Sequence, residues 1–127
     1  MDRAEFVEQY TEIVKRALYC AEKARRESWL ALDAEIINEK ADGRDIFEYG
    51  LRFVTDGVAR EFINIILSNL VEQEKDGQKR TLKNIQKEAV LLIQEGINPE
   101  LLYLILNSFT DIPLNKDKAR IIPDREN

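Results

Sequence analysis

Apolar residues recur every three or four positions along the first third of the chain. Residues 2–39 contain no glycine or proline and consist mostly of good helix formers, so the pattern predicts one long helix. Its apolar stripe is bulky at the start and small from Ala17 onward. The stripe consists of Phe6, Tyr10, Ile13, Val14, Ala17, Ala21, Ala24, Ser28, Ala31 and Leu32. Small residues at this spacing allow close approach of a second helix, from the same chain or from another copy.

Two further amphipathic segments follow a turn at residues 41–44. Asp45 can cap a short helix over residues 46–55, and Asp56-Gly57 is a second turn signal. Residues 58–75 then predict a strongly amphipathic helix, because apolar residues step by four along it. The row is Val58, Phe62, Ile66 and Leu70, flanked by Ile63, Leu67 and Val71. We expect this face to be covered by other helices.

The last third predicts two more helices. Asp76-Gly77 lies in a charged stretch, and we favour a break there over a solvated weak point within a longer helix. The helical pattern resumes over residues 82–95, Gly96 stops it, and Asn98-Pro99 begins a last helix over residues 99–109. Apolar residues almost surround this last helix, so it belongs to the core or to an oligomer interface. They are Leu101, Leu102, Leu104, Ile105 and Leu106.

These segments predict an all-α fold: a single-domain bundle of about five helices with one long N-terminal helix. No segment shows the alternation of a half-buried strand. We expect a helical domain at residues 1–112 and a polar, frayed tail at residues 113–127, where there is little to bury.

Composition excludes several function classes. The chain has 127 residues, 24 of them acidic and 19 basic, and its net charge of -5 makes nucleic acid an unfavourable partner. Cys20 is its only cysteine and it has no histidine, so we expect neither an intrachain disulfide nor a zinc site. Apolar runs are far shorter than the roughly 20 residues of a membrane span, and no secretion signal is visible. These features favour a soluble, cytoplasmic chain.

Catalytic chemistry has no clear carrier in the sequence. It contains no phosphate-binding loop and no nucleophile beside a base. Pairs of carboxylates such as Glu88 with Glu95, or Asp42 with Asp45, fall at solvated or capping positions. We therefore expect no enzyme activity, no cofactor and no metal.

Two segments resemble one known family. KARRESWLALDAEI, residues 23–36, resembles the entry into the cytoplasmic region of MotA-type flagellar stator proteins. IFEYGLRFVTDGVAREFINIIL, residues 46–67, is similar to the next conserved segment of that family. Ser28, Trp29 and Asp33 depart from the family pattern. The resemblance implies a relative that lacks the transmembrane helices, so ion conduction does not carry over.

The resemblance also implies a binding site. In the family, a basic and an acidic residue of the first motif face opposite charges on the rotor protein, and they match Arg25 and Asp33. On one continuous helix these two residues would lie about 12 Å apart and within about 80° of each other around the axis. Trp29 would lie between them. The candidate protein-binding residues are Arg25, Arg26, Trp29 and Asp33.

The same residues also have simpler interpretations. A charged run on a helix is usually its solvated face, and a tryptophan more often closes a core than anchors an interface. We expect a non-catalytic protein-interaction module that resembles the stator cytoplasmic region and contacts flagellar rotor or stator proteins through a charged helix face. The alternative is a self-associating helical structural or regulatory protein, hence a possible homo-oligomer.

Overall fold

The structure, a computed structural model, describes residues 1–28, 31–32 and 45–115. Its helices are α1 (Arg3–Arg26), α3 (Ile46–Thr55), α4 (Arg60–Glu72), α5 (Gly77–Gln94) and α6 (Pro99–Asn107). No strand occurs within these residues. The predicted all-α bundle with a long N-terminal helix is therefore confirmed.

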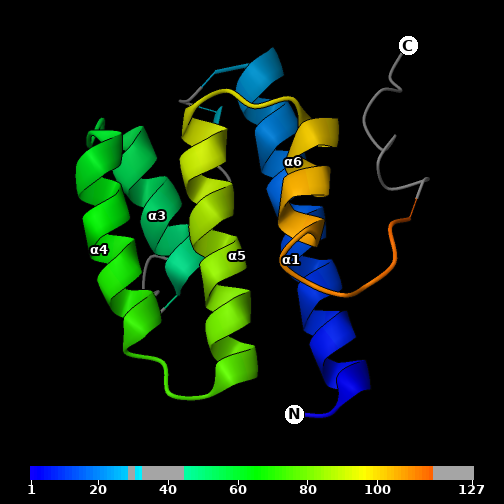
Figure 1. Cartoon of the computed structure of the whole chain (residues 1–127). Coiled ribbons are helices and arrows are strands. Elements are labelled where there is room, and N and C mark those ends of the chain that lie inside the picture. Colours follow the sequence, from blue (N-terminus) through cyan, green and yellow to red (C-terminus); the bar gives the residue numbers. More distant parts are fainter. Residues whose placement is uncertain (29–30, 33–44, 116–127) are drawn as a thin grey trace.

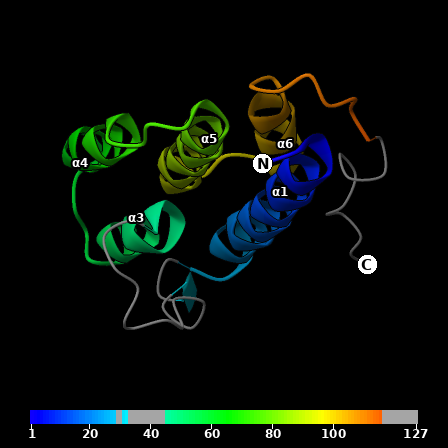
Figure 2. The same cartoon turned by 90° about the horizontal axis from the view of Figure 1, so that it is seen from below.

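The helices pack in two layers, and α5 is the central helix of the bundle. Seen along the bundle, α4, α5 and α6 form one layer and α3 and α1 form the other (Figure 2). Helix α5 contacts the other four helices, and α1 also contacts α6 while α3 contacts α4 (Figure 1). The buried side chains form one continuous core. Its members include Val14, Ala17, Leu51, Ile63, Leu67, Ile85, Leu102 and Leu106.

Local signals in the sequence fix most of the helix starts. The side chains of Asp2, Asp45, Asp76 and Asn98 each accept a hydrogen bond from a backbone N–H of the first helical turn. Pro99 occupies the first turn of α6, as predicted. At Gly57 and Gly96 the backbone has a φ near +80°, a conformation that glycine adopts without strain.

Several predicted helix bounds were wrong. Helix α1 ends at Arg26, with Glu27 as its C-cap, well before residue 39. Ala31 and Leu32 are again helical, and residues 33–44 lie outside the described part of the chain. No glycine or proline marks this end, so the local pattern could not reveal it. The predicted break near Asp76-Gly77 is confirmed, but α5 begins at Gly77 rather than residue 82 because Asp76 caps it.

The segment after α6 is tied back onto the bundle. Arg3 Nη1 lies 2.7 Å from Asp111 Oδ1, which joins the start of α1 to this segment. Ile112 packs against the core, and the Asn115 N–H donates to the Tyr103 hydroxyl at 2.9 Å. The polar tail predicted at 113–127 is therefore anchored up to residue 115. Residues 116–127 lie outside the described part of the chain.

Candidate protein-interaction surface

The predicted charged face begins at the C-terminal end of α1. Arg25 and Arg26 both lie in its last turn and are exposed. The Arg26 guanidinium lies 3.4 Å from the Glu22 carboxylate, one turn earlier in the same helix. Arg25 and Arg26 are thus accessible to a partner, while Arg26 also makes an intrahelical ion pair.

The rest of the predicted site cannot be placed beside them. Trp29 and Asp33 lie outside the described residues. The expected 12 Å separation between Arg25 and Asp33 assumed one continuous helix, and α1 ends at Arg26. The premise of one continuous helix from Arg25 onward was therefore wrong, because Glu27 is the C-cap of α1.

The basic residues at the end of α1 also have a local role. Lys23, Arg25 and Arg26 all occupy the last turn, where positive charge interacts favourably with the helix macrodipole. The Glu27 N–H donates to the Lys23 carbonyl and closes this turn. This local role is sufficient to explain why these positions are basic, with no need for a protein partner.

The small residues of α1 serve packing within the chain. Ala17 and Ala21 are buried, and Ala24 is partly buried against the core. Helix α1 contacts α5 and α6 of the same chain. The close approach expected from small residues is therefore made inside one chain, and this part of the stripe offers no surface for self-association.

The row of α4 residues that is buried in the core is not the row that begins with Val58 and Phe62. The buried residues are Ile63, Leu67 and Val71, whereas the Phe62 side chain is 56% exposed. A step of four residues advances about 400°, so such a row drifts about 40° around the helix at each step. The buried row drifts in the same way, but Phe62 lies about 100° around the helix from Ile63, so its row starts on the outside of the bundle.

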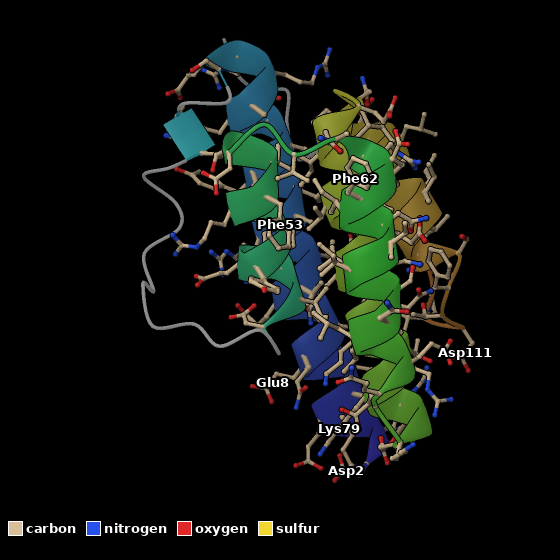
Figure 3. All side chains as sticks on the ribbon, turned by 90° about the vertical axis from the view of Figure 1, so that its left-hand side faces the viewer. Asp2, Glu8, Phe53, Phe62, Lys79 and Asp111 are labelled. Atoms are coloured by element: carbon tan, nitrogen blue, oxygen red, sulfur yellow. The ribbon has the colours of Figure 1, made fainter. Side chains whose placement is uncertain are left out.

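The outward apolar residues of α4 continue onto α3. Ile65 is 57% exposed and Ile66 is half-buried, and both neighbour Phe62 on the helix surface. On α3, Tyr49 and Phe53 are half-buried, with ring centroids 4.7 Å apart. Phe53 and Phe62 lie on the same side of the molecule (Figure 3). We call Tyr49, Phe53, Phe62, Ile65 and Ile66 the α3–α4 surface.

This surface is unusual for an exposed side of a small domain. Single exposed apolar side chains are common, but adjacent aromatic and aliphatic ones on two neighbouring helices are typical of interaction sites. Aromatic residues are also enriched where protein interfaces carry most of their binding energy. The sequence contained a signal for it, because the apolar positions of residues 58–75 cover two rows while the core needs only one.

An ion pair between a partly exposed arginine and a buried glutamate joins α1 to α3. Arg16 Nη2 lies 2.9 Å from Glu48 Oε1, and the guanidinium carbon lies 5.3 Å from the centre of the Phe47 ring. The Glu48 side chain is 5% exposed. Its other oxygen, Oε2, has no hydrogen-bond partner. A buried carboxylate is costly without a positive partner, so Arg16 is needed to stabilise Glu48 at this position.

A shallow hollow of about 330 Å³ adjoins this pair. It is lined by Glu12, Ile13, Arg16, Asp45, Phe47 and Gln86. Two of these polar groups already have structural roles, since Asp45 caps α3 and the side-chain Oε1 of Gln86 accepts the Phe47 N–H. The hollow brings together no nucleophile and base, and we assign it no chemistry. Sequence reasoning missed the pair because its members are 32 residues apart.

A second exposed apolar strip lies on α6. Leu101 and Leu104 are 50% and 45% exposed, while Leu102, Tyr103 and Leu106 are buried. The prediction that the last helix is central to the core thus holds for one side of it, and the other side faces outward.

The shifted ionisations all have structural causes. Burial raises the pKa of the Tyr10 hydroxyl, against the smaller effect of the hydrogen bond from the Asn107 amide. A hydrogen bond from Lys83, and then one from the Asp76 N–H, lowers the pKa of Glu74. A hydrogen bond from Arg3 lowers the pKa of Asp111. Each contact ties two elements together.

Metal-binding clusters and membrane-spanning helices are both absent from the described part of the chain. There, no group of three or more histidine, cysteine, aspartate or glutamate side chains could hold a metal ion. No helix within the same residues has the length and apolar character needed to cross a membrane.

Comparison with known proteins gives no relative from which to transfer a function: no protein-family model, no curated protein and no solved structure matches this chain.

Proposed function

We propose that this chain is a non-catalytic protein-interaction module that binds another protein through the α3–α4 surface. The observation that carries the proposal is that Phe62 and Ile65 are both more than half exposed, with Phe62 on the same side of the molecule as Phe53 (Figure 3). Burying apolar surface on a partner is the main favourable term in protein association. Completing the burial of Phe62 and Ile65 would contribute about 1–2 kcal/mol each.

Phe62 and Ile65 are well suited to binding because neither belongs to the core, whereas Tyr49 and Phe53 of the same surface pack against it. The core of α4 is made by Ile63, Leu67 and Val71, which lie on another side of the helix. Polar substitution of Phe62 or Ile65 should therefore weaken association while leaving the bundle folded.

The test compares proteins retained by the wild-type chain and by two variants. The first variant is Phe62→Ser/Ile65→Ser, and the control is Leu114→Ser, a similarly exposed apolar residue outside the surface. We expect a partner that is retained by the wild type and the control and lost with the double variant. Circular dichroism checks that all three chains are folded. Equal retention by all three would exclude this surface as the binding site.

A narrower proposal names the partner as a flagellar rotor or stator protein. Its support is the resemblance of residues 23–36 and 46–67 to the stator cytoplasmic region, together with the exposure of Arg25 and Arg26. Binding of purified rotor and stator proteins would be measured for the wild type, Arg25→Glu and Asp33→Lys. Lys15→Glu, an exposed reversal in the middle of α1, is the control. If neither protein binds, or the first two reversals have no more effect than the control, this narrower proposal fails.

Self-association is the second candidate, and the outward side of α6 favours it. Leu101 and Leu104 would be covered if two copies met there. Sedimentation velocity at high micromolar concentration should then show a dimer that Leu101→Ser/Leu104→Ser converts to monomer. A wild-type chain that stays monomeric under those conditions excludes this candidate.

A further inference from the structure

We infer that the occupant of the α3–α4 surface is an amphipathic helix whose apolar side is flanked by lysine or arginine residues. This inference rests on the proposed function, because it names the chemistry of a partner for the same surface. It follows from the charges that lie beside the apolar side chains.

The exposed charges next to the apolar residues of α4 are acidic. Glu61 and Glu72 are exposed and lie almost in line with Ile65 along the helix, four residues before it and seven after it. The single basic residue of α4, Arg60, lies 3.2 Å from the Glu95 carboxylate of α5. On α3, Arg52 and Asp56 contribute one charge of each sign. The α4 side of the surface therefore has an excess of negative charge.

The end of α4 adds to this field. Its last turn contains Glu72 and no basic residue, so the negative end of the helix macrodipole is not offset within the helix. Arg80, from the next helix, donates instead to the carbonyls of Glu74 and Lys75 in the connecting loop. A cation from a partner would be favoured at Glu72.

The spacing of the two carboxylates sets the spacing expected in the partner. Glu61 and Glu72 are eleven positions apart in the sequence, which corresponds to about 16 Å along a helix. A partner helix lying along α4 would present apolar residues to Phe62 and Ile65 and basic residues about eleven positions apart to the two glutamates. Helices that bind by laying an apolar side on a surface present apolar anchors at i, i+3, i+4 and i+7, which leaves the flanking positions free to carry the basic residues.

A second copy of this chain fits the surface less well. In a two-fold symmetric contact between two α4 helices running in opposite directions, Glu61 of one copy would approach Glu72 of the other. Like charges brought together at an interface oppose binding, and the whole chain already carries a net charge of -5. A basic partner meets neither obstacle.

The test uses two synthetic amphipathic helices of about 18 residues with identical apolar positions. One carries lysines about eleven positions apart beside its apolar side, and the other carries glutamates there. Binding to the full chain is measured by calorimetry and by chemical-shift changes in the protein. We expect the basic peptide to bind at least tenfold more tightly, with shifts centred on Phe62 and Ile65 and with affinity that falls as salt is added.

Charge reversal on the protein provides the matched comparison. Glu61→Lys/Glu72→Lys should weaken the basic peptide about tenfold and strengthen the acidic one, since two attractive pairs become repulsive. Glu8→Lys/Glu100→Lys changes the net charge equally on α1 and α6 and should leave both affinities nearly unchanged. Phe62 lies towards the opposite end of the molecule from Glu8 (Figure 3).

Each result bears on the two proposals separately. Suppose that chemical shifts change at Phe62 but the two peptides bind equally, or the acidic one binds more tightly. That result overturns the inference of a basic partner and leaves the surface as an interaction site. Binding of the basic peptide that is unaffected by Phe62→Ser/Ile65→Ser overturns it too, because the contact lies elsewhere. Absence of binding by both peptides, or self-association that depends on Phe62, also overturns the inference. The wild-type and double-variant retention experiment independently decides the proposed function.

Discussion

The approach of α3 to α5 depends on a glycine, and adding one methyl group there should destabilise the bundle. Gly50 is buried in α3, and a Cβ atom at this position would lie 2.8 Å from both γ-carbons of Val90 and 3.0 Å from Leu67 Cδ1. Val90 is fully buried and β-branched, so its methyl groups cannot rotate away without straining the core. Gly50→Ala therefore forces α3 away from α5.

Two opposing effects set the size of the change. Alanine is favoured over glycine inside a helix by about 1 kcal/mol. Overpacking of a dense core costs about 1–3 kcal/mol, and contacts as short as 2.8 Å on a stiff side chain place this site towards the upper part of that range. We expect Gly50→Ala to lower the free energy of unfolding by about 1–2 kcal/mol.

Urea unfolding followed by circular dichroism measures this change. Val90→Ala alone should cost about 2 kcal/mol through the cavity that it leaves. The loss in free energy of unfolding for Gly50→Ala/Val90→Ala should be about 1 kcal/mol smaller than the summed losses of the two single variants. The reason is that the new methyl group occupies part of the cavity.

Gly77→Ala is the control for helix propensity. Nothing lies within 4 Å of a Cβ added at Gly77, the first residue of α5, so this substitution should be neutral or stabilising by up to about 1 kcal/mol. If Gly50→Ala stabilises the chain as Gly77→Ala does, or if the double variant shows no coupling, the close approach of α3 and α5 is not as described.

The other predictions concern buried and paired polar groups. Arg16→Met should lower the free energy of unfolding by about 3 kcal/mol because it leaves the Glu48 carboxylate buried without its cation, and adding Glu48→Gln should recover part of the loss. The hydrogen bond from Lys83 lowers the pKa of Glu74 in the folded chain, and the stability that this contributes is fully present above pH 4.5. It is lost as the pH falls through the lowered pKa. Lys83→Met should therefore weaken the dependence of the free energy of unfolding on pH in that acidic range. Tyr10→Phe should cost about 1–3 kcal/mol in thermal or urea unfolding, since it leaves a buried amide unpaired.

The sequence alone determined which segments are helical and where most of them begin. Asp45 and the Asn98-Pro99 pair were predicted as helix starts, and Asp76, predicted only to lie at a break, proved to be a cap as well. Each acts on backbone groups only a few residues away. Gly96 marked the end of α5 for the same reason. Signals of this kind need no knowledge of the rest of the fold.

The candidate site was only partly visible in the sequence. Arg25 and Arg26 were expected to be accessible and are exposed. The α3–α4 surface was not anticipated, because two apolar rows of α4 have similar composition and both are compatible with a core-facing role. Which row is buried depends on where α3 and α5 lie.

The tertiary structure decided the features that depend on distant contacts. The end of α1 at Arg26 carries no local stop signal, Ala17 and Ala21 are buried within the chain, and Glu48 pairs with Arg16 across 32 residues. Helical periodicity specifies how residues are arranged around one axis, but it does not specify the rotation of that axis relative to its neighbours. That rotation is fixed by the packing of the whole core, so the outward surface emerges only when the helices are assembled.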